Sequence, residues 1–173
     1  MYQDYKDLLS AFQSHGVRYL VVGGFAVIYH SQPRFTKDMD LLIKPDLENA
    51  KATYAALAEF GATLTGITPE DFTDRNSFFR FGREPKGFDI LPSIPGVDFE
   101  AAWERRIETV IDTASSQIAN FISAEDLIAS KLASGRPQDL ADVHAIRKAQ
   151  ESQRPKPGTK KPPETISGSG PNQ

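Results

Sequence analysis

The feature that most constrains the fold is a buried strand followed by a glycine pair and, one helix later, by two carboxylates. Residues 19–24 read Tyr-Leu-Val-Val-Gly-Gly, which is typical of a buried strand that ends in a tight turn at a helix start. Residues 38–41 read Asp-Met-Asp-Leu. Because side chains alternate along a strand, Asp38 and Asp40 are expected on one face. Adjacent carboxylates repel each other unless a cation lies between them, and oxygen ligands suit Mg²⁺ or Mn²⁺, so this segment predicts a metal site.

The composition indicates a globular domain with a substantial core. The 173 residues are 39% hydrophobic and 25% charged, as in an ordinary single domain. The formal net charge of -3 provides no overall positive field for nucleic acid, although a local basic patch is compatible with it. The absence of cysteine excludes disulfides, thiolate zinc sites and thiol nucleophiles. The longest apolar run, at 19–29, contains two glycines and is too short to cross a bilayer. We expect a cytoplasmic protein that does not bind membranes.

Periodicity and turn residues predict alternating helices and strands. Helices are expected at 2–15, 23–29, 45–60, 99–104, 127–133 and 137–149, and strands at 18–22, 39–43, 63–65, 77–81, 88–91, 107–111 and 117–122. Residues 123–126 carry a capping-box pattern before one of these helices. This mixed order predicts an α/β (α+β) fold, a small mixed sheet with helices packed on one side. We divide the chain into a core at 1–122 and a C-terminal helical segment at 123–150.

The remaining residues, 151–173, form a tail rich in proline, glycine, serine and lysine. Ile166 is its only aliphatic side chain, so the tail cannot bury enough apolar surface to offset its ordering entropy and is predicted to be disordered. Its four Lys and Arg residues minus its two Glu residues give +2, which leaves about -5 for the rest of the chain. A basic tail could contact RNA or an acidic partner, but a plain solvated terminus is the simpler interpretation.

Gly23 and Gly24 allow two interpretations. At a helix start, free backbone N–H groups and the positive end of the helix dipole favour a phosphate group. A glycine pair between a strand and a helix is also required by a tight turn alone, with no ligand. Combined with Asp38 and Asp40, the glycines would supply a phosphate cradle and a metal clamp about one helix apart, and this combination is far more specific than either feature.

These motifs carry a resemblance to a known superfamily. Val22-Gly23-Gly24 followed by Asp38-Met39-Asp40-Leu41 resembles the signature of the DNA polymerase β-like nucleotidyltransferases. The phrases at 23–26 and 34–40, with 126–128, Lys131 and 136–142, are similar to minimal nucleotidyltransferases related to the AbiEii-type abortive-infection toxins. The chain has Gly-Gly and Lys37 where antitoxin-like relatives have Gly-Ser and Ser, which favours the abortive-infection branch. The similarity spans roughly residues 17–149.

The resemblance implies a third carboxylate, for which Asp89 is the best candidate. Asp89 lies between Phe88 and Ile90, so on a strand it would point away from both, although a solvated strand residue would show the same pattern. The superfamily mechanism would then have two Mg²⁺ ions held by Asp38, Asp40 and Asp89. Asp89 would be the carboxylate nearest the attacking hydroxyl and the expected proton acceptor.

Arg34 and Lys131 are the expected partners of the nucleotide phosphates, beside Gly23 and Gly24. Each also has a plainer interpretation, since Arg34 can simply pair with a carboxylate and a lysine on the 127–133 helix can be solvated. The resemblance places Asp139 in a polar cluster with Lys131, where structural pairing is the simpler explanation. His15, His30 and His144 lack ligand spacing, which argues against zinc.

The expected function is transfer of a nucleoside monophosphate from an NTP to a hydroxyl, with Mg²⁺ or Mn²⁺ as cofactor. The acceptor could be RNA such as tRNA, a protein, or a small molecule as in resistance-type enzymes. A toxin that acts on tRNA would be expected to have a neutralising partner protein. Two alternatives stay open: a non-catalytic nucleotide-binding or antitoxin-like module on the same fold, and a structural domain in which the two Asp residues are merely exposed on a strand.

Overall fold

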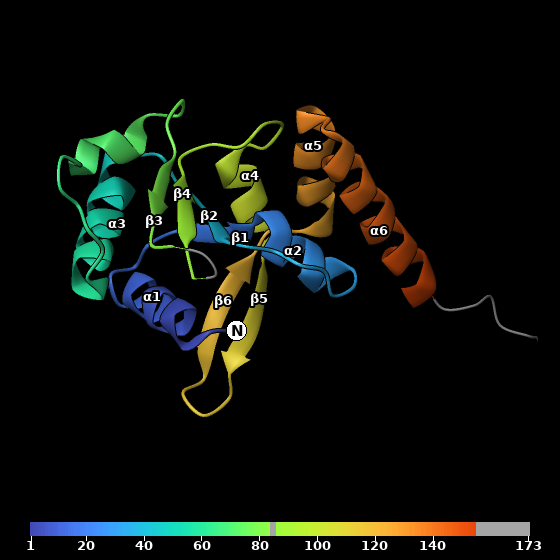
Figure 1. The fold of residues 1–173 in the computed structure, drawn as a ribbon, viewed down its shortest axis with the longest axis horizontal. Coiled ribbons are helices and arrows are strands. Elements are labelled where there is room, and N and C mark those ends of the chain that lie inside the picture. The colour runs from blue at the N-terminus through green and yellow to red at the C-terminus, as the bar shows by residue number, and fades with distance from the viewer. Residues whose placement is uncertain (84–85, 155–173) are drawn as a thin grey trace, which may run out of the picture.

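The computed structural model describes residues 1–83 and 86–154, and the strands in these ranges form one mixed sheet of six strands (Figure 1). The strands are β1 (Tyr19–Val22), β2 (Met39–Ile43), β3 (Phe79–Phe81), β4 (Phe88–Leu91), β5 (Ile107–Asp112) and β6 (Gln117–Phe121). Their order across the sheet is β3-β4-β2-β1-β6-β5. β2 pairs antiparallel with β1 and parallel with β4. The predicted mixed α/β fold is therefore confirmed, and the strand that follows Asp38 lies inside the sheet.

Helices contact both faces of this sheet. They are α1 (Gln3–Ser14), α2 (Gly23–His30), α3 (Leu47–Phe60), the 3-10 helix η1 (Pro69–Thr73), α4 (Phe99–Glu104), α5 (Ala124–Ser134) and α6 (Pro137–Gln153). Edge-to-face ring pairs join α1 to β1, α3 to β4 and η1 to β3, through Phe12–Tyr19, Phe60–Phe88 and Phe72–Phe79. The expected helical layer is thus present on this face, but the expectation that helices pack on one side only needs correction. On the opposite face, Leu127 of α5 borders a small pocket together with Asp40.

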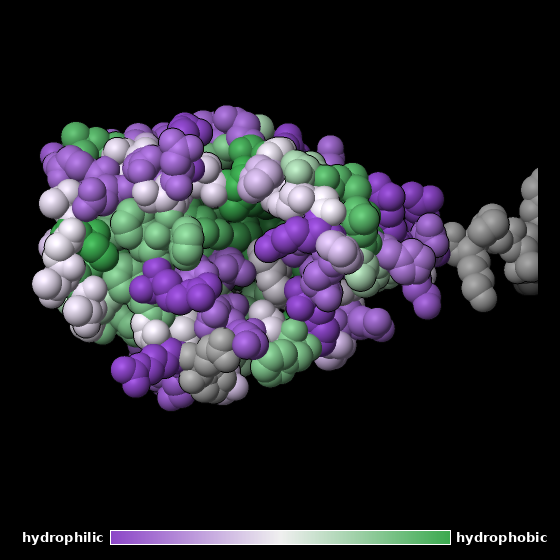
Figure 2. Space-filling view, turned by 45° about the horizontal axis from the view of Figure 1, so that its top comes forward, coloured by the Kyte–Doolittle hydropathy of each residue, from purple (hydrophilic) through white to green (hydrophobic). Residues whose placement is uncertain are grey.

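The core is continuous and is centred on the two middle strands. All four residues of β1 are buried, and Met39, Leu41 and Ile43 of β2 are completely inaccessible to solvent. Burial on both faces explains why β1 reads as an unbroken apolar run rather than an alternating one. The space-filling view in Figure 2 shows a hollow where hydrophobic residues are visible between hydrophilic ones. Within the described ranges, no helix combines the length and the apolar character needed to cross a bilayer.

Two strand predictions need correction. Residues 63–65 do not form a strand: they lie between Gly61 and Gly66, which both have positive φ, and the N–H of Ile67 donates to the carbonyl of Leu64 in a turn. This turn takes Leu64 out of an extended pairing conformation, so the segment joins none of the described strands of the sheet. β3 begins at Phe79 rather than at residue 77, because the N–H and the hydroxyl of Ser77 are both bonded to Asp74.

The C-terminal helices have the predicted caps, although α5 begins at Ala124, three residues before the predicted start. The Ser123 hydroxyl accepts a hydrogen bond from the N–H of Asp126 at 3.1 Å, which confirms the expected N-cap of α5. Gly135 ends that helix with φ +66°, and Pro137 occupies the first turn of α6. α6 continues to Gln153, so the first residues of the predicted disordered tail are helical. The rest of the tail, 155–173, lies outside the described residues.

Candidate functional site

The three predicted carboxylates lie at the N-terminal ends of two neighbouring parallel strands, β2 and β4. Asp40 on β2 and Asp89 on β4 are direct partners in the parallel strand register, so their side chains leave the sheet on the same face. Asp38 precedes β2 and lies two residues before Asp40, which gives it the same orientation. Across the other side of β2, Asp40 pairs in register with Val22, the residue before the glycine pair. Strand order therefore brings the acids and the glycines together.

The electrostatics of Asp40 show that these acids are close to one another. Burial, followed by repulsion from Asp89 and more weakly from Asp38, raises the pKa of Asp40 to about 6. Attraction to Lys131 and a hydrogen bond from the backbone of Gly24 act in the opposite direction. A half-buried carboxylate between two others is the arrangement that disfavours ionisation without a cation.

All seven residues that the sequence analysis assigned to the site line one pocket of about 350 Å³. They are Gly23, Gly24, Arg34, Asp38, Asp40, Asp89 and Lys131. Sequence reasoning gave no functional role to several other lining residues, namely Thr36, Arg80, Arg136 and Gln138. Thr36, Arg136 and Gln138 lie inside the phrases 34–40 and 136–142 that carry the resemblance, whereas no local motif marks Arg80 on β3.

The glycines are required by close contacts with the site. Gly23 has φ +59°, and a Cβ atom at this position would lie 1.9 Å from Oδ2 of Asp40. A Cβ on Gly24 would lie 2.3 Å from Oγ1 of Thr36. The tight-turn interpretation of this pair therefore holds. Because the Gly24 backbone donates to Asp40, one clear role of the turn is to orient that carboxylate, while phosphate binding by the two glycines stays a prediction.

Arg80 is the most informative residue that sequence reasoning missed. Its Nε donates to Oδ1 of Asp89 at 2.9 Å and its Nη2 donates to Oδ2 at 2.8 Å. Nη2 also lies 4.0 Å from Oδ2 of Asp38. Arg80 alternates with Phe79 and Phe81 along β3 and pairs in register with Asp89. The alternation was visible in the sequence, but only the pairing of β3 with β4 places the guanidinium over Asp89.

A second cluster of charged side chains lines the pocket where α5 meets α6. Lys131 donates to Oδ1 of Asp139 at 2.9 Å and lies 2.9 Å from Oδ2 of Asp142. Arg34 donates to the same Asp142 oxygen at 3.2 Å, and Nε of Arg136 donates to Asp139 at 2.6 Å. The expected cluster of Lys131 with Asp139 is confirmed, and so is the structural pairing of Arg34 with a carboxylate. Three cations against two carboxylates leave net positive charge beside Asp40.

The donor set suits a divalent cation, although the side chains as they stand do not form a finished metal site. Asp38, Asp40 and Asp89 offer only oxygen ligands, which suit Mg²⁺ or Mn²⁺. Among residues 1–83 and 86–154, no group of three or more His, Asp or Glu side chains is arranged to hold an ion. Both oxygens of Asp89 face Arg80 instead. Metal binding by these acids stays a prediction.

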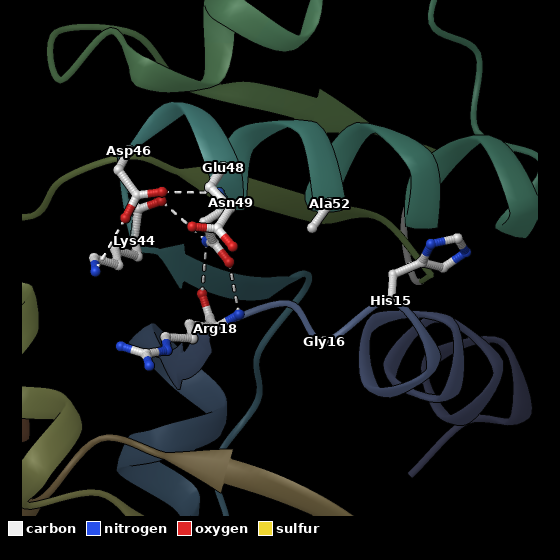
Figure 3. A pocket seen from close by; sticks show the side chains of 8 residues that line it. All are labelled: His15, Gly16, Arg18, Lys44, Asp46, Glu48, Asn49 and Ala52. Atoms are coloured by element: carbon white, nitrogen blue, oxygen red, sulfur yellow. Dashed lines mark hydrogen bonds and ion pairs between the residues drawn. The ribbon is translucent and has the colours of Figure 1, made fainter.

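A separate pocket of about 190 Å³ lies between the end of α1 and the start of α3 (Figure 3). Its central polar residue, Asn49, accepts from the N–H of Arg18 at 2.8 Å and donates to the carbonyls of Arg18 and Lys44 at 3.0 and 2.9 Å. Asp46 caps α3 by accepting from the N–H of Asn49. These bonds tie α3 to the outer ends of β1 and β2, so a structural role accounts for the polar residues here.

The chain is similar to known nucleotidyltransferases. A protein-family model described as "Nucleotidyltransferase of unknown function (DUF6036)" matches residues 3–151. The chain belongs to this family. Membership in DUF6036 confirms the predicted superfamily at the level of nucleotidyltransferases, while the abortive-infection branch stays a prediction. A search of curated proteins found no match.

Solved structures support the same fold. The DUF6036 protein is similar to the lincosamide antibiotic adenylyltransferase LnuA in its lincomycin-bound form, with a TM-score of 0.53. The match covers 86% of this chain and 98% of that chain at 17% sequence identity. At this identity the likeness shows the fold alone, so it does not indicate which acceptor this protein uses.

Proposed function

We propose that this protein transfers a nucleoside monophosphate from an NTP to a hydroxyl group. The observation that carries the proposal is the direct pairing of Asp40 with Asp89 across adjacent strands, with Gly23 packed against the Asp40 carboxylate. Membership in a nucleotidyltransferase family supports the same reaction class. Asp38, Asp40 and Asp89 would hold Mg²⁺ or Mn²⁺, which when bound would lower the pKa of the attacking hydroxyl and neutralise charge on the leaving group.

The residues of the pocket supply the remaining requirements of this reaction. The acceptor oxygen forms a bond to the α-phosphorus, the bond from that phosphorus to the β-phosphate oxygen breaks, and pyrophosphate leaves. Arg34 and Lys131 line the pocket and would neutralise phosphate oxygens. The proton of the hydroxyl passes to a carboxylate, for which we propose Asp89, provided that its oxygens are released from Arg80.

The acceptor is proposed only as a class. A hydroxyl on RNA such as tRNA, on a protein or on a small molecule is compatible with a pocket lined by both cations and carboxylates. Likeness in fold to an adenylyltransferase of an antibiotic favours testing small molecules alongside RNA. If tRNA is the acceptor, a toxin role with a neutralising partner protein follows. The alternative of a non-catalytic nucleotide-binding module is favoured by one observation, the engagement of both Asp89 oxygens by Arg80.

Thermal stabilisation by nucleotide tests the binding half of the proposal. An NTP at about 100 times its dissociation constant with Mg²⁺ should raise the melting temperature by roughly 5–10 °C. Asp38→Asn should abolish this shift, because it removes one charge from the proposed metal site. Asp7→Asn removes the same charge from an exposed position on α1 outside the pocket and should keep the shift. A wild-type protein that no NTP and Mg²⁺ stabilise would contradict nucleotide binding.

Label transfer tests the catalytic half. Wild-type protein is incubated with each α-phosphate-labelled NTP and with RNA, protein and small-molecule fractions of a cell extract. Label should move to one fraction with wild type and with Asp7→Asn, and not with Asp38→Asn. Nucleotide-dependent stabilisation without label transfer to any fraction would favour the non-catalytic module over the enzyme.

A further inference from the structure

The Arg80 guanidinium supplies the positive charge that the nearly buried Asp89 carboxylate requires. The carboxylate side chain of Asp89 is only 8% exposed, whereas the side chain of Arg80 is 61% exposed. A nearly buried carboxylate is costly unless it is paired. The two-pronged contact at 2.9 and 2.8 Å uses both oxygens of Asp89, and the same guanidinium lies 4.0 Å from Asp38. One guanidinium therefore contacts one of the proposed metal ligands and lies near another.

A metal ion and this guanidinium compete for the same Asp89 carboxylate. A carboxylate that accepts two hydrogen bonds from one arginine fork has two of its roughly four lone-pair sites occupied, and the guanidinium charge repels a divalent cation at the others. Asp89 and Arg80 also differ in how freely their side chains can move. Asp89 is nearly buried on β4 inside the sheet, whereas Arg80 is exposed on the edge strand β3.

We propose that Arg80 takes the place of a metal ion on Asp89 in the metal-free protein. It leaves Asp89 when a divalent metal binds, and it pairs with the triphosphate when an NTP is bound as well. This inference rests on the proposed function. Arg80 lines the same pocket as Arg34 and Lys131, so the displaced guanidinium stays within the region where phosphate oxygens would lie. Its planar fork suits phosphate as well as carboxylate. Metal alone must break the ion pair, whereas metal with nucleotide gives Arg80 a new partner.

The inference predicts coupling between metal and nucleotide. Each ligand should raise the affinity of the protein for the other, because both favour the state in which Arg80 has left Asp89. A purely structural ion pair predicts the opposite response to mutation. If Arg80 only held β3 against β4 and shaped the site, its removal would weaken metal binding rather than strengthen it.

The experiment measures Mn²⁺ binding directly, by the loss of the free Mn²⁺ electron paramagnetic resonance signal. Wild type, Arg80→Gln, Arg83→Gln and Asp38→Asn are titrated without nucleotide and with a non-hydrolysable NTP analogue. Arg83 is an exposed arginine outside the carboxylate pocket, so its variant controls for the lost charge. Arg80→Gln should bind Mn²⁺ about tenfold more tightly than wild type without nucleotide, the order expected for a lost bond to a charged group. The gain in Mn²⁺ affinity caused by the analogue should shrink by a similar factor.

The possible results separate this inference from the proposed function. If Arg80→Gln binds Mn²⁺ no more tightly than wild type while Asp38→Asn loses Mn²⁺, the proposed role of Arg80 is overturned and the metal site survives. If wild type and Arg80→Gln both ignore Mn²⁺ with and without the analogue, both proposals fail. Arg80→Lys keeps the charge without the fork and should give an intermediate affinity, so it carries the test if Arg80→Gln does not fold.

Discussion

Replacement of Gly23 by alanine should destabilise the protein and displace the Asp40 carboxylate. Gly23 has φ +59°, a conformation that costs a residue with a Cβ atom about 1–2 kcal/mol. The new Cβ would lie 1.9 Å from Oδ2 of Asp40, so the carboxylate must leave its rotamer at a cost of about 0.5–1.5 kcal/mol. The sum is about 1.5–3.5 kcal/mol. For a chain of this size, it corresponds to a fall in melting temperature of roughly 3–14 °C.

Gly16→Ala is the matched control. Gly16 has φ +64°, and a Cβ there would meet nothing within 4 Å, so this variant carries only the backbone cost of about 1–2 kcal/mol. Thermal and urea unfolding of both variants therefore isolate the clash with Asp40. Gly23→Ala should also lose stabilisation by NTP and Mg²⁺, whereas Gly16→Ala should retain it. Equal destabilisation in the two variants, with nucleotide stabilisation intact in both, would refute the geometry argued for the site.

Two further predictions concern the scaffold. Burial acts to raise the pKa of Asp126, but hydrogen bonds from Arg105 and Ser123 outweigh it and lower that pKa. Because the folded pKa lies below the unfolded one, this stabilisation is present at neutral pH and lost in acid. Asp126→Asn should therefore melt below wild type at about pH 7, with a gap that closes below about pH 4; a gap independent of pH would contradict this. Leu41→Ala, at a completely buried position, should cost about 2–5 kcal/mol in urea unfolding, and a loss under about 1 kcal/mol would contradict its place in the core.

Local patterns were enough to predict most of the secondary structure and the central motif. The apolar run ending at Gly23 and the alternation around Asp40 depend on neighbouring residues, because strand side chains alternate and glycine permits a positive φ. Predictions failed where a short apolar pattern lay between turns, as at residues 63–65, since pattern alone does not show whether a pairing partner exists. Asp89 was found because its alternation on a strand could be combined with the resemblance carried by Asp38 and Asp40.

The amino-acid sequence by itself determined the candidate motif: the glycine turn, the paired acids and the strand that carries Asp40. Only the tertiary structure decided what surrounds them. The contact of Arg80 with Asp89 depends on β3 joining the edge of β4, and the contact of Arg34 with Asp142 joins residues that are 108 positions apart. The physical reason is that strand order and helix packing depend on burial over the whole chain, whereas turns and alternation depend on a few adjacent residues.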